Sequence, residues 1–170
     1  MSLSIYEVSI PVLIRGLTNL SAIIEKAATH AAAKNIDPVV LAQARLYPDM
    51  HPLTRQVQIA CDTAKGAAAR LAGIEVPKHE DNEVSLADLK HRIAKTLDFL
   101  KSVSVDRLNG AETRAIEIVS PNRTLKFTGL SYLTNFVLPN FFFHESVTYA
   151  LLRQNGVEVG KADFLGSLGQ

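Results

Sequence analysis

Apolar residues recur every three or four positions in four long segments of this chain, and this pattern most limits what the chain can fold into. The segments cover residues 5–33, 51–72, 85–100 and 130–154. Such spacing places apolar side chains on one face of an α-helix, which must pack against other helices to leave water. The chain is therefore predicted to be mainly α, a four-helix bundle whose helices alternate in direction, with one crossover connection. Its 170 residues favour a single domain over residues 1–170.

Local signals mark where these helices begin and bend. Asp37-Pro38 predicts a further short helix, with the aspartate as its cap and the proline in its first turn. Residues 85–88 resemble a capping box that opens the third long helix. Pro11 predicts a kink in the first long helix, and Pro139 predicts a kink or a break in the last.

Two connections carry patterns of their own. Residues 75–84 are mostly charged or polar and have no apolar periodicity, which predicts a surface loop. Residues 116–118 and 124–127 alternate around a turn at 120–123, which predicts a small β-hairpin. Because two strands alone are marginal in water, the hairpin should lie on the helices, within the crossover between the third and fourth long helices. Part of the tail, residues 157–170, is expected to dock.

Charge balance and cysteine content exclude several classes of protein. Eighteen Lys and Arg against 17 Asp and Glu give a net charge of +1, so no nucleic-acid partner is expected. The most apolar window, residues 10–24, is interrupted by Arg15 and is shorter than the roughly 20 residues of a membrane span, so no membrane partner is expected. The start of the chain has no secretory signal, and the single cysteine, Cys61, excludes an internal disulfide. Both features favour a cytoplasmic protein.

A polar stripe in the last helix is the first candidate site. Asn140, His144 and Thr148 are four residues apart, so they line one stripe of the helix, beside Phe141, Val147 and Leu151. Phe141 and Tyr149 add aromatic side chains to this set of three polar residues. These five residues could line a ligand pocket. Alternatively, His144 hydrogen-bonds inside the bundle and the phenylalanines belong to the core.

A metal site is the second candidate. His51 and His144 could bind a divalent metal such as Zn, Ni, Fe or Mn, although a catalytic zinc usually has three protein ligands. A carboxylate from Asp49, Asp62 or Glu145 could supply an oxygen ligand. The other histidines are expected at the surface and Cys61 in the core, while Arg55, Arg70, Arg92 and Arg153 are expected on solvated helix faces.

Several stretches resemble a known bacterial family. They are Asp49-Met50-His51-Pro52-Leu53, Gln56-Val57-Gln58, Phe141-Phe142-Phe143-His144, and the ending from Tyr149 to Gly166. The chain resembles domain-of-unknown-function family number nineteen ninety-three, which is placed with the DinB-like helical bundles. The resemblance covers nearly the whole chain and implies a DinB-like four-helix bundle.

The resemblance also implies properties of the superfamily, whose members are commonly dimers and often bind a divalent metal through three histidines. One such histidine lies near the start of the second helix, where His51 matches it. The other two lie four residues apart on the last long helix, where His144 matches the first and Thr148 stands in place of the second. Some DinB-like enzymes use the metal to activate a low-molecular-weight thiol for transfer.

Two functions follow from these observations. The first is a metal-free or metal-degenerate dimeric module that binds a small molecule through Asn140, Phe141, His144, Thr148 and Tyr149. The alternative is a divalent-metal-dependent hydrolase or thiol transferase that uses the two histidines. A homodimer is expected in either case, because the first 24 residues carry almost no charge. The catalytic residues, the substrate and the reaction type are not predicted, since a fold does not name a reaction.

Overall fold

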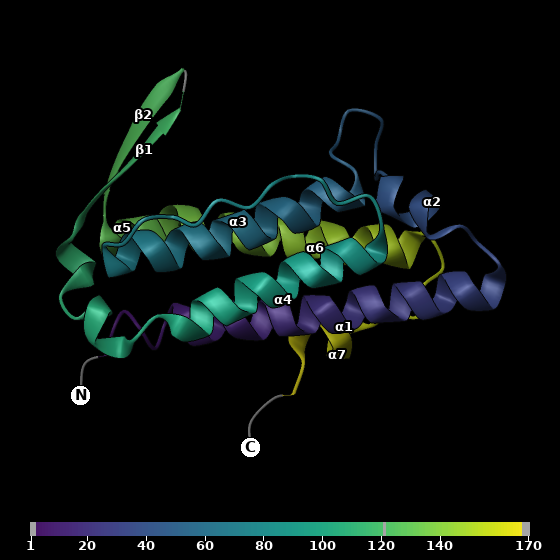
Figure 1. The fold of residues 1–170 in the computed structure, drawn as a ribbon, viewed down its shortest axis with the longest axis horizontal. Helices are drawn as coiled ribbons and strands as arrows, with labels where there is room; N and C mark the ends of the chain where they lie inside the picture. Colours follow the sequence, from purple (N-terminus) through teal and green to yellow (C-terminus); the bar gives the residue numbers. More distant parts are fainter. Residues whose placement is uncertain (1–2, 121, 168–170) are drawn as a thin grey trace.

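A computed structural model describes residues 3–120 and 122–167 of the chain. In this part of the chain, the long helices are α1 (Ile10–Lys34), α3 (Leu53–Ala72), α4 (Leu86–Ser102) and α6 (Leu138–Gln154). They form a bundle in which α1 packs against α4, α3 packs against α6, and α3 also packs against α4 (Figure 1). The predicted mainly α architecture is confirmed, and its core is built from the apolar stripes of these helices.

The helices do not alternate in direction, so this part of the sequence interpretation is wrong. Following the chain in Figure 1, α3 and α4 run one way while α1 and α6 run the other way. The crossover is residues 73–85, which return along α3 before α4 begins, and not the hairpin segment. Apolar periodicity places a face on a helix but contains no information on which way the helix runs, which explains the error.

An ionic cluster fastens this crossover to the bundle. The Arg92 side chain is only 1% exposed, and its guanidinium lies 2.9 Å from Asp62, 3.0 Å from Asp81 and 2.9 Å from Glu83. The remaining members are Arg55, 2.6 Å from Asp81, and Lys65, 3.0 Å from Asp62. The expectation that Arg92 lies on a solvated face is therefore wrong, because acidic groups of the crossover and of α3 surround it.

Helix starts agree with the sequence signals. Ser85 and Asp88 form the predicted capping box of α4, with Ser85 Oγ accepting the Asp88 N–H at 3.1 Å. The short helix α2 (Pro38–Gln43) starts at Asp37, whose carboxylate accepts the Val39 N–H at 2.9 Å. Pro11 lies in the first turn of α1, where its missing N–H leaves no helical hydrogen bond unmade. Pro11 is therefore compatible with a regular first turn, and α1 is one continuous helix from Ile10 to Lys34.

The last helical segment continues through Pro139. It comprises α5 (Gly129–Tyr132), a π-helical turn η3 (Leu133–Val137), and α6. Pro139 has no N–H to donate and its ring crowds the carbonyl four residues earlier, so the preceding backbone widens into a π turn instead of breaking. The predicted disturbance is present, but as a local widening beside the α3 interface.

Shorter elements complete the described chain. Two 3₁₀ turns, Val105–Leu108 and Ala111–Thr113, lead into the predicted hairpin of β1 (Ala115–Ser120) and β2 (Arg123–Thr128). The strands pair antiparallel, with Ile118 opposite Leu125, and project from one end of the bundle (Figure 1). Pro121 of the predicted turn lies outside the described residues. Part of the tail docks as α7 (Lys161–Leu165) against α1.

Over the described residues, no helix is both long enough and apolar enough to cross a membrane. Cys61 is fully buried in the core, and burial raises the pKa of its thiol to about 12. A thiol with such a pKa stays protonated near neutral pH and is a poor nucleophile.

Candidate functional site

Three polar contacts join α3 to the α5–α6 segment along one line. Gln56 Oε1 lies 2.7 Å from His144 Nδ1. About two turns further along α3, Thr63 Oγ1 accepts a hydrogen bond from Asn140 Nδ2 at 2.7 Å. After two more turns, an Arg70 guanidinium nitrogen donates to the Tyr132 hydroxyl at 3.2 Å. We call these contacts the polar seam; its residues are Gln56, Thr63, Arg70, Tyr132, Asn140 and His144.

The α3 half of the polar seam was missed by the sequence interpretation. Gln56, Thr63 and Arg70 are seven residues apart, which is nearly two helical turns, so they share one stripe of α3. A polar residue every seven positions inside an apolar pattern is a readable signal. It indicates a helix interface that carries hydrogen bonds as well as apolar contacts.

The Gln56 amide fixes the tautomer of His144. Gln56 Nε2 donates to the His51 carbonyl at 3.0 Å, which orients the amide so that its oxygen faces His144. An amide oxygen only accepts hydrogen bonds, so Nδ1 of His144 must carry the hydrogen and donate it to Gln56. A neutral His144 then carries its lone pair on Nε2, which is the usual arrangement of a histidine ligand or base.

His144 favours the neutral form. Burial lowers its pKa below the ordinary histidine value, and the nearby His51 and Arg55 lower it further. The side chain is 8% exposed, whereas His51 is exposed at the turn before α3. The two predicted metal-site histidines are therefore close enough to interact electrostatically, and they lie at the same end of the polar seam.

The third position of the superfamily's metal pattern does not offer a ligand. Thr148 is fully buried, and its hydroxyl donates to the backbone carbonyl of His144 at 2.9 Å. No group of three or more His, Cys, Asp or Glu side chains in residues 3–120 and 122–167 is arranged to hold a metal ion. The side chains present therefore do not fit a three-histidine centre.

The other predicted ligand-binding residues are distributed over different surfaces. Phe141 is fully buried, and a Cβ on Gly16 of α1 would lie 2.5 Å from its ring, so it is packed tightly in the core. Tyr149 faces α7, where its ring meets Phe164 edge to face with centroids 6.1 Å apart. Asn140 and His144 face α3. Of the five predicted residues, the structure brings these two together on the polar seam.

A groove opens beside the polar seam, with a volume of about 250 Å³. Its walls come from α3, from the α5–α6 segment and from the hairpin, and the lining residues are Arg55, Ile59, Asp62, Thr63, Arg70, Ile118, Tyr132, Phe136 and Asn140. The groove thus combines apolar and aromatic walls with several charged and hydrogen-bonding side chains, a mixture that can orient a small ligand.

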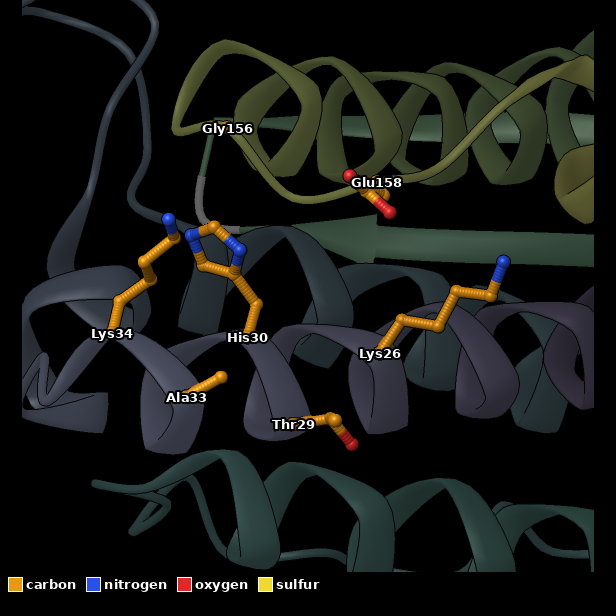
Figure 2. Close-up of a pocket in the computed structure, with 7 residues that line it drawn as sticks. All are labelled: Lys26, Thr29, His30, Ala33, Lys34, Gly156 and Glu158. Carbon is orange, nitrogen blue, oxygen red and sulfur yellow. The ribbon is translucent and has the colours of Figure 1, made fainter.

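A larger cavity of about 480 Å³ lies between the end of α1 and the segment after α6. Figure 2 shows Lys26, His30 and Lys34 extending from α1 toward Gly156 and Glu158. Lys26 already pairs with Asp163 at 2.7 Å, and the lysines lie at the surface. This cavity lacks the buried, oriented polar groups of the groove, so the groove is the stronger candidate.

The fold and this site define a DinB-like helical bundle. The crystal structure of a DinB family member protein from Shewanella denitrificans is similar, with a TM-score of 0.88 and 42% identity over 97% of this chain and 93% of that chain. The chain belongs to the family described as a domain of unknown function (DUF1993), whose profile matches residues 5–165. The resemblance stated from the sequence is thereby confirmed. A comparison with curated proteins finds no match.

Glu145 is a buried acid on the opposite side of α6 from the groove. It is 1% exposed, and neither carboxylate oxygen has a hydrogen-bond partner among the described residues. Burial raises its pKa to about 7, although Arg15 opposes the shift. An ionised carboxylate without partners is costly in such a place, so Glu145 is held in its protonated form below neutral pH.

We expect Glu145→Gln to remove a pH dependence of stability. The pKa of Glu145 rises from 4.5 to about 7 on folding, so its contribution is fully present below 4.5 and is lost as the pH rises through 7. Relative to the variant, the wild-type free energy of unfolding should fall by about 2.5 kcal/mol between about pH 5 and about pH 8. Urea unfolding of both proteins measures this difference, and because both contain the same histidines, their titration cancels. Parallel pH profiles would contradict the prediction.

Proposed function

We propose that this protein is a small-molecule-binding module that works without a metal ion and takes its ligand in the groove beside the polar seam. One observation carries the proposal. The Thr148 hydroxyl, at the third position of the metal pattern, is buried and bonded to its own helix, whereas the groove offers open hydrogen-bonding groups. A metal centre of the superfamily's pattern would lack its third histidine here, while the groove supplies side chains suited to a small ligand, and this contrast supports the metal-free function.

A second candidate function is a divalent-metal-dependent hydrolase or thiol transferase that uses His51 and His144. It is favoured by the orientation of His144, whose Nε2 lone pair is left available when Gln56 accepts from Nδ1. Two imidazoles alone give a weaker and less selective site than three. The two functions therefore differ in metal content.

The metal content of untagged protein tests the proposal. We expect far less than one zinc, nickel, iron or manganese ion per chain after purification without chelators, and no retention of added metal through gel filtration. His51→Ala and His144→Ala should leave this result unchanged. One ion per chain in the wild type, lost in either variant, would refute the metal-free function and support the second candidate.

We also propose that the protein is a homodimer that pairs through the exposed stripe of α1. Among the exposed side chains of residues 3–24, only Glu7 and Arg15 are charged, and the exposed stripe of α1 also presents Pro11, Thr18 and Ala22. Surfaces depleted of charge are typical of the centres of protein interfaces. The same dimer is proposed for both candidate functions.

Light scattering at micromolar concentration should give the mass of two chains. Ala22→Asp, which places a charge in the proposed interface, should shift the protein toward the monomer. Ala94→Asp is the matched control, because Ala94 is likewise an exposed alanine within a helix, on α4. A wild-type monomer, or an equal effect of both substitutions, would refute this interface.

A further inference from the structure

The charges around the groove are compensated except for one. The ionic cluster contains three cations, Arg55, Lys65 and Arg92, and each lies within 3.0 Å of a carboxylate. It also contains three carboxylates, Asp62, Asp81 and Glu83, each within 3.0 Å of a cation. The cluster is therefore closed and neutral, and its members Arg55 and Asp62 bring no net charge to the groove.

Arg70 is the groove cation outside this cluster. Among the described residues, no carboxylate lies within ion-pair distance of its guanidinium, and its one side-chain partner is the Tyr132 hydroxyl. A guanidinium has five N–H donors, so most of its donors stay available. An uncompensated, partly buried guanidinium beside a groove attracts an anion, and its planar fork matches a carboxylate.

The position of Arg70 is fixed by neighbouring residues. Its guanidinium folds back over Gly66, one turn earlier on α3, where a Cβ would overlap it. Tyr132, which holds it from the other helix, is only 1% exposed. Gly66 therefore leaves the space that the Arg70 guanidinium occupies.

The rest of the groove is suited to a flat apolar body. Tyr132 and Phe136 stack with ring centroids 5.9 Å apart and planes 14° apart, and Phe127 of the hairpin flanks both. Ile59 and Ile118 close the remaining apolar walls. A volume of about 250 Å³ is below the usual range for drug-sized ligands, so the occupant must be small.

We propose that the groove binds a small planar organic acid, whose carboxylate pairs with Arg70 and whose apolar body lies along Phe136 and the isoleucines. This inference rests on the proposed function and names its ligand class. Asn140, whose amide already donates to Thr63, supplies a further polar group at the rim. Arg70 sets the specificity for an acid, and Gly66 is a positioning residue for Arg70.

Benzoate and its neutral isostere benzamide test the ligand class. In a titration of the labelled wild-type protein followed by amide NMR shifts, benzoate should perturb groove residues, including those of Ile59–Arg70 and Tyr132–Asn140. Benzamide should bind about tenfold more weakly, because it lacks the charge-assisted pair. Added salt should weaken benzoate more than benzamide.

Three variants assign the effect to Arg70. Arg70→Met should remove the preference for benzoate, while Arg153→Met, at an exposed arginine of α6, should leave it unchanged. Gly66→Ala should also weaken benzoate by displacing the guanidinium, although alanine favours the helix by about 1 kcal/mol, so thermal stability should not fall. Loss of affinity with retained stability separates positioning from misfolding.

The possible outcomes separate this inference from the proposed function. Equal binding of benzamide and benzoate in the groove, or a preference that survives Arg70→Met, would refute the acid ligand and leave the groove as a binding site. Shifts confined to other surfaces, such as the cavity around His30, or no shifts at millimolar benzoate, would also refute the acid ligand. The metal content of the protein tests the proposed function separately.

Discussion

The antiparallel contact between α3 and α6 is the interaction on which the candidate site depends. A seven-residue spacing on α3 meets polar groups of the last helical segment, so the polar seam keeps one register along the whole interface. Buried polar groups that lose their partners are costly, so sliding one helix by a turn would break all three contacts together. The same register orients His144, holds Arg70 against Tyr132 and sets the width of the groove. The site is thus a consequence of helix packing and not of a flexible loop.

The crossover loop explains why α3 can present polar groups on two of its sides. One side forms the polar seam, while the other carries Asp62 and Lys65 into the ionic cluster around Arg92. A buried guanidinium without partners would destabilise the fold. Arg92 instead pairs with one carboxylate of α3 and two of the loop, and donates to a backbone carbonyl of the loop. The loop therefore acts as part of the bundle, and its acids neutralise Arg55. This compensation leaves Arg70 as the distinctive charge of the groove.

Sequence patterns predicted the elements far better than their arrangement. The capping box at Ser85, the hairpin and the long helices all have local signals, because each depends on residues a few positions apart. The direction of α4 follows from the path of the crossover loop, and the burial of Arg92 depends on carboxylates that contact it in the fold but lie 9 to 30 residues away in the sequence. Patterns over a few neighbouring positions contain no trace of either. His144 was correctly singled out as a residue of interest, and its pairing with Gln56 matches the internally hydrogen-bonded alternative. Asn140 and Tyr149 lie on opposite sides of α6, and their spacing already implies this, because nine residues make two and a half turns of a helix.

The nitrogen NMR spectrum of the His144 imidazole reports directly on the protonation and the metal-free state of this end of the polar seam. If Gln56 orients the ring and no metal is required, His144 should be neutral near neutral pH, with its proton on Nδ1. Its two nitrogen shifts should then stay unchanged when zinc is added, and Gln56→Leu should abolish the tautomer preference. A proton on Nε2 would contradict the proposed orientation of the seam. Zinc-dependent shifts of Nε2 of His144 and of a ring nitrogen of His51 would show that this end of the bundle is a metal site.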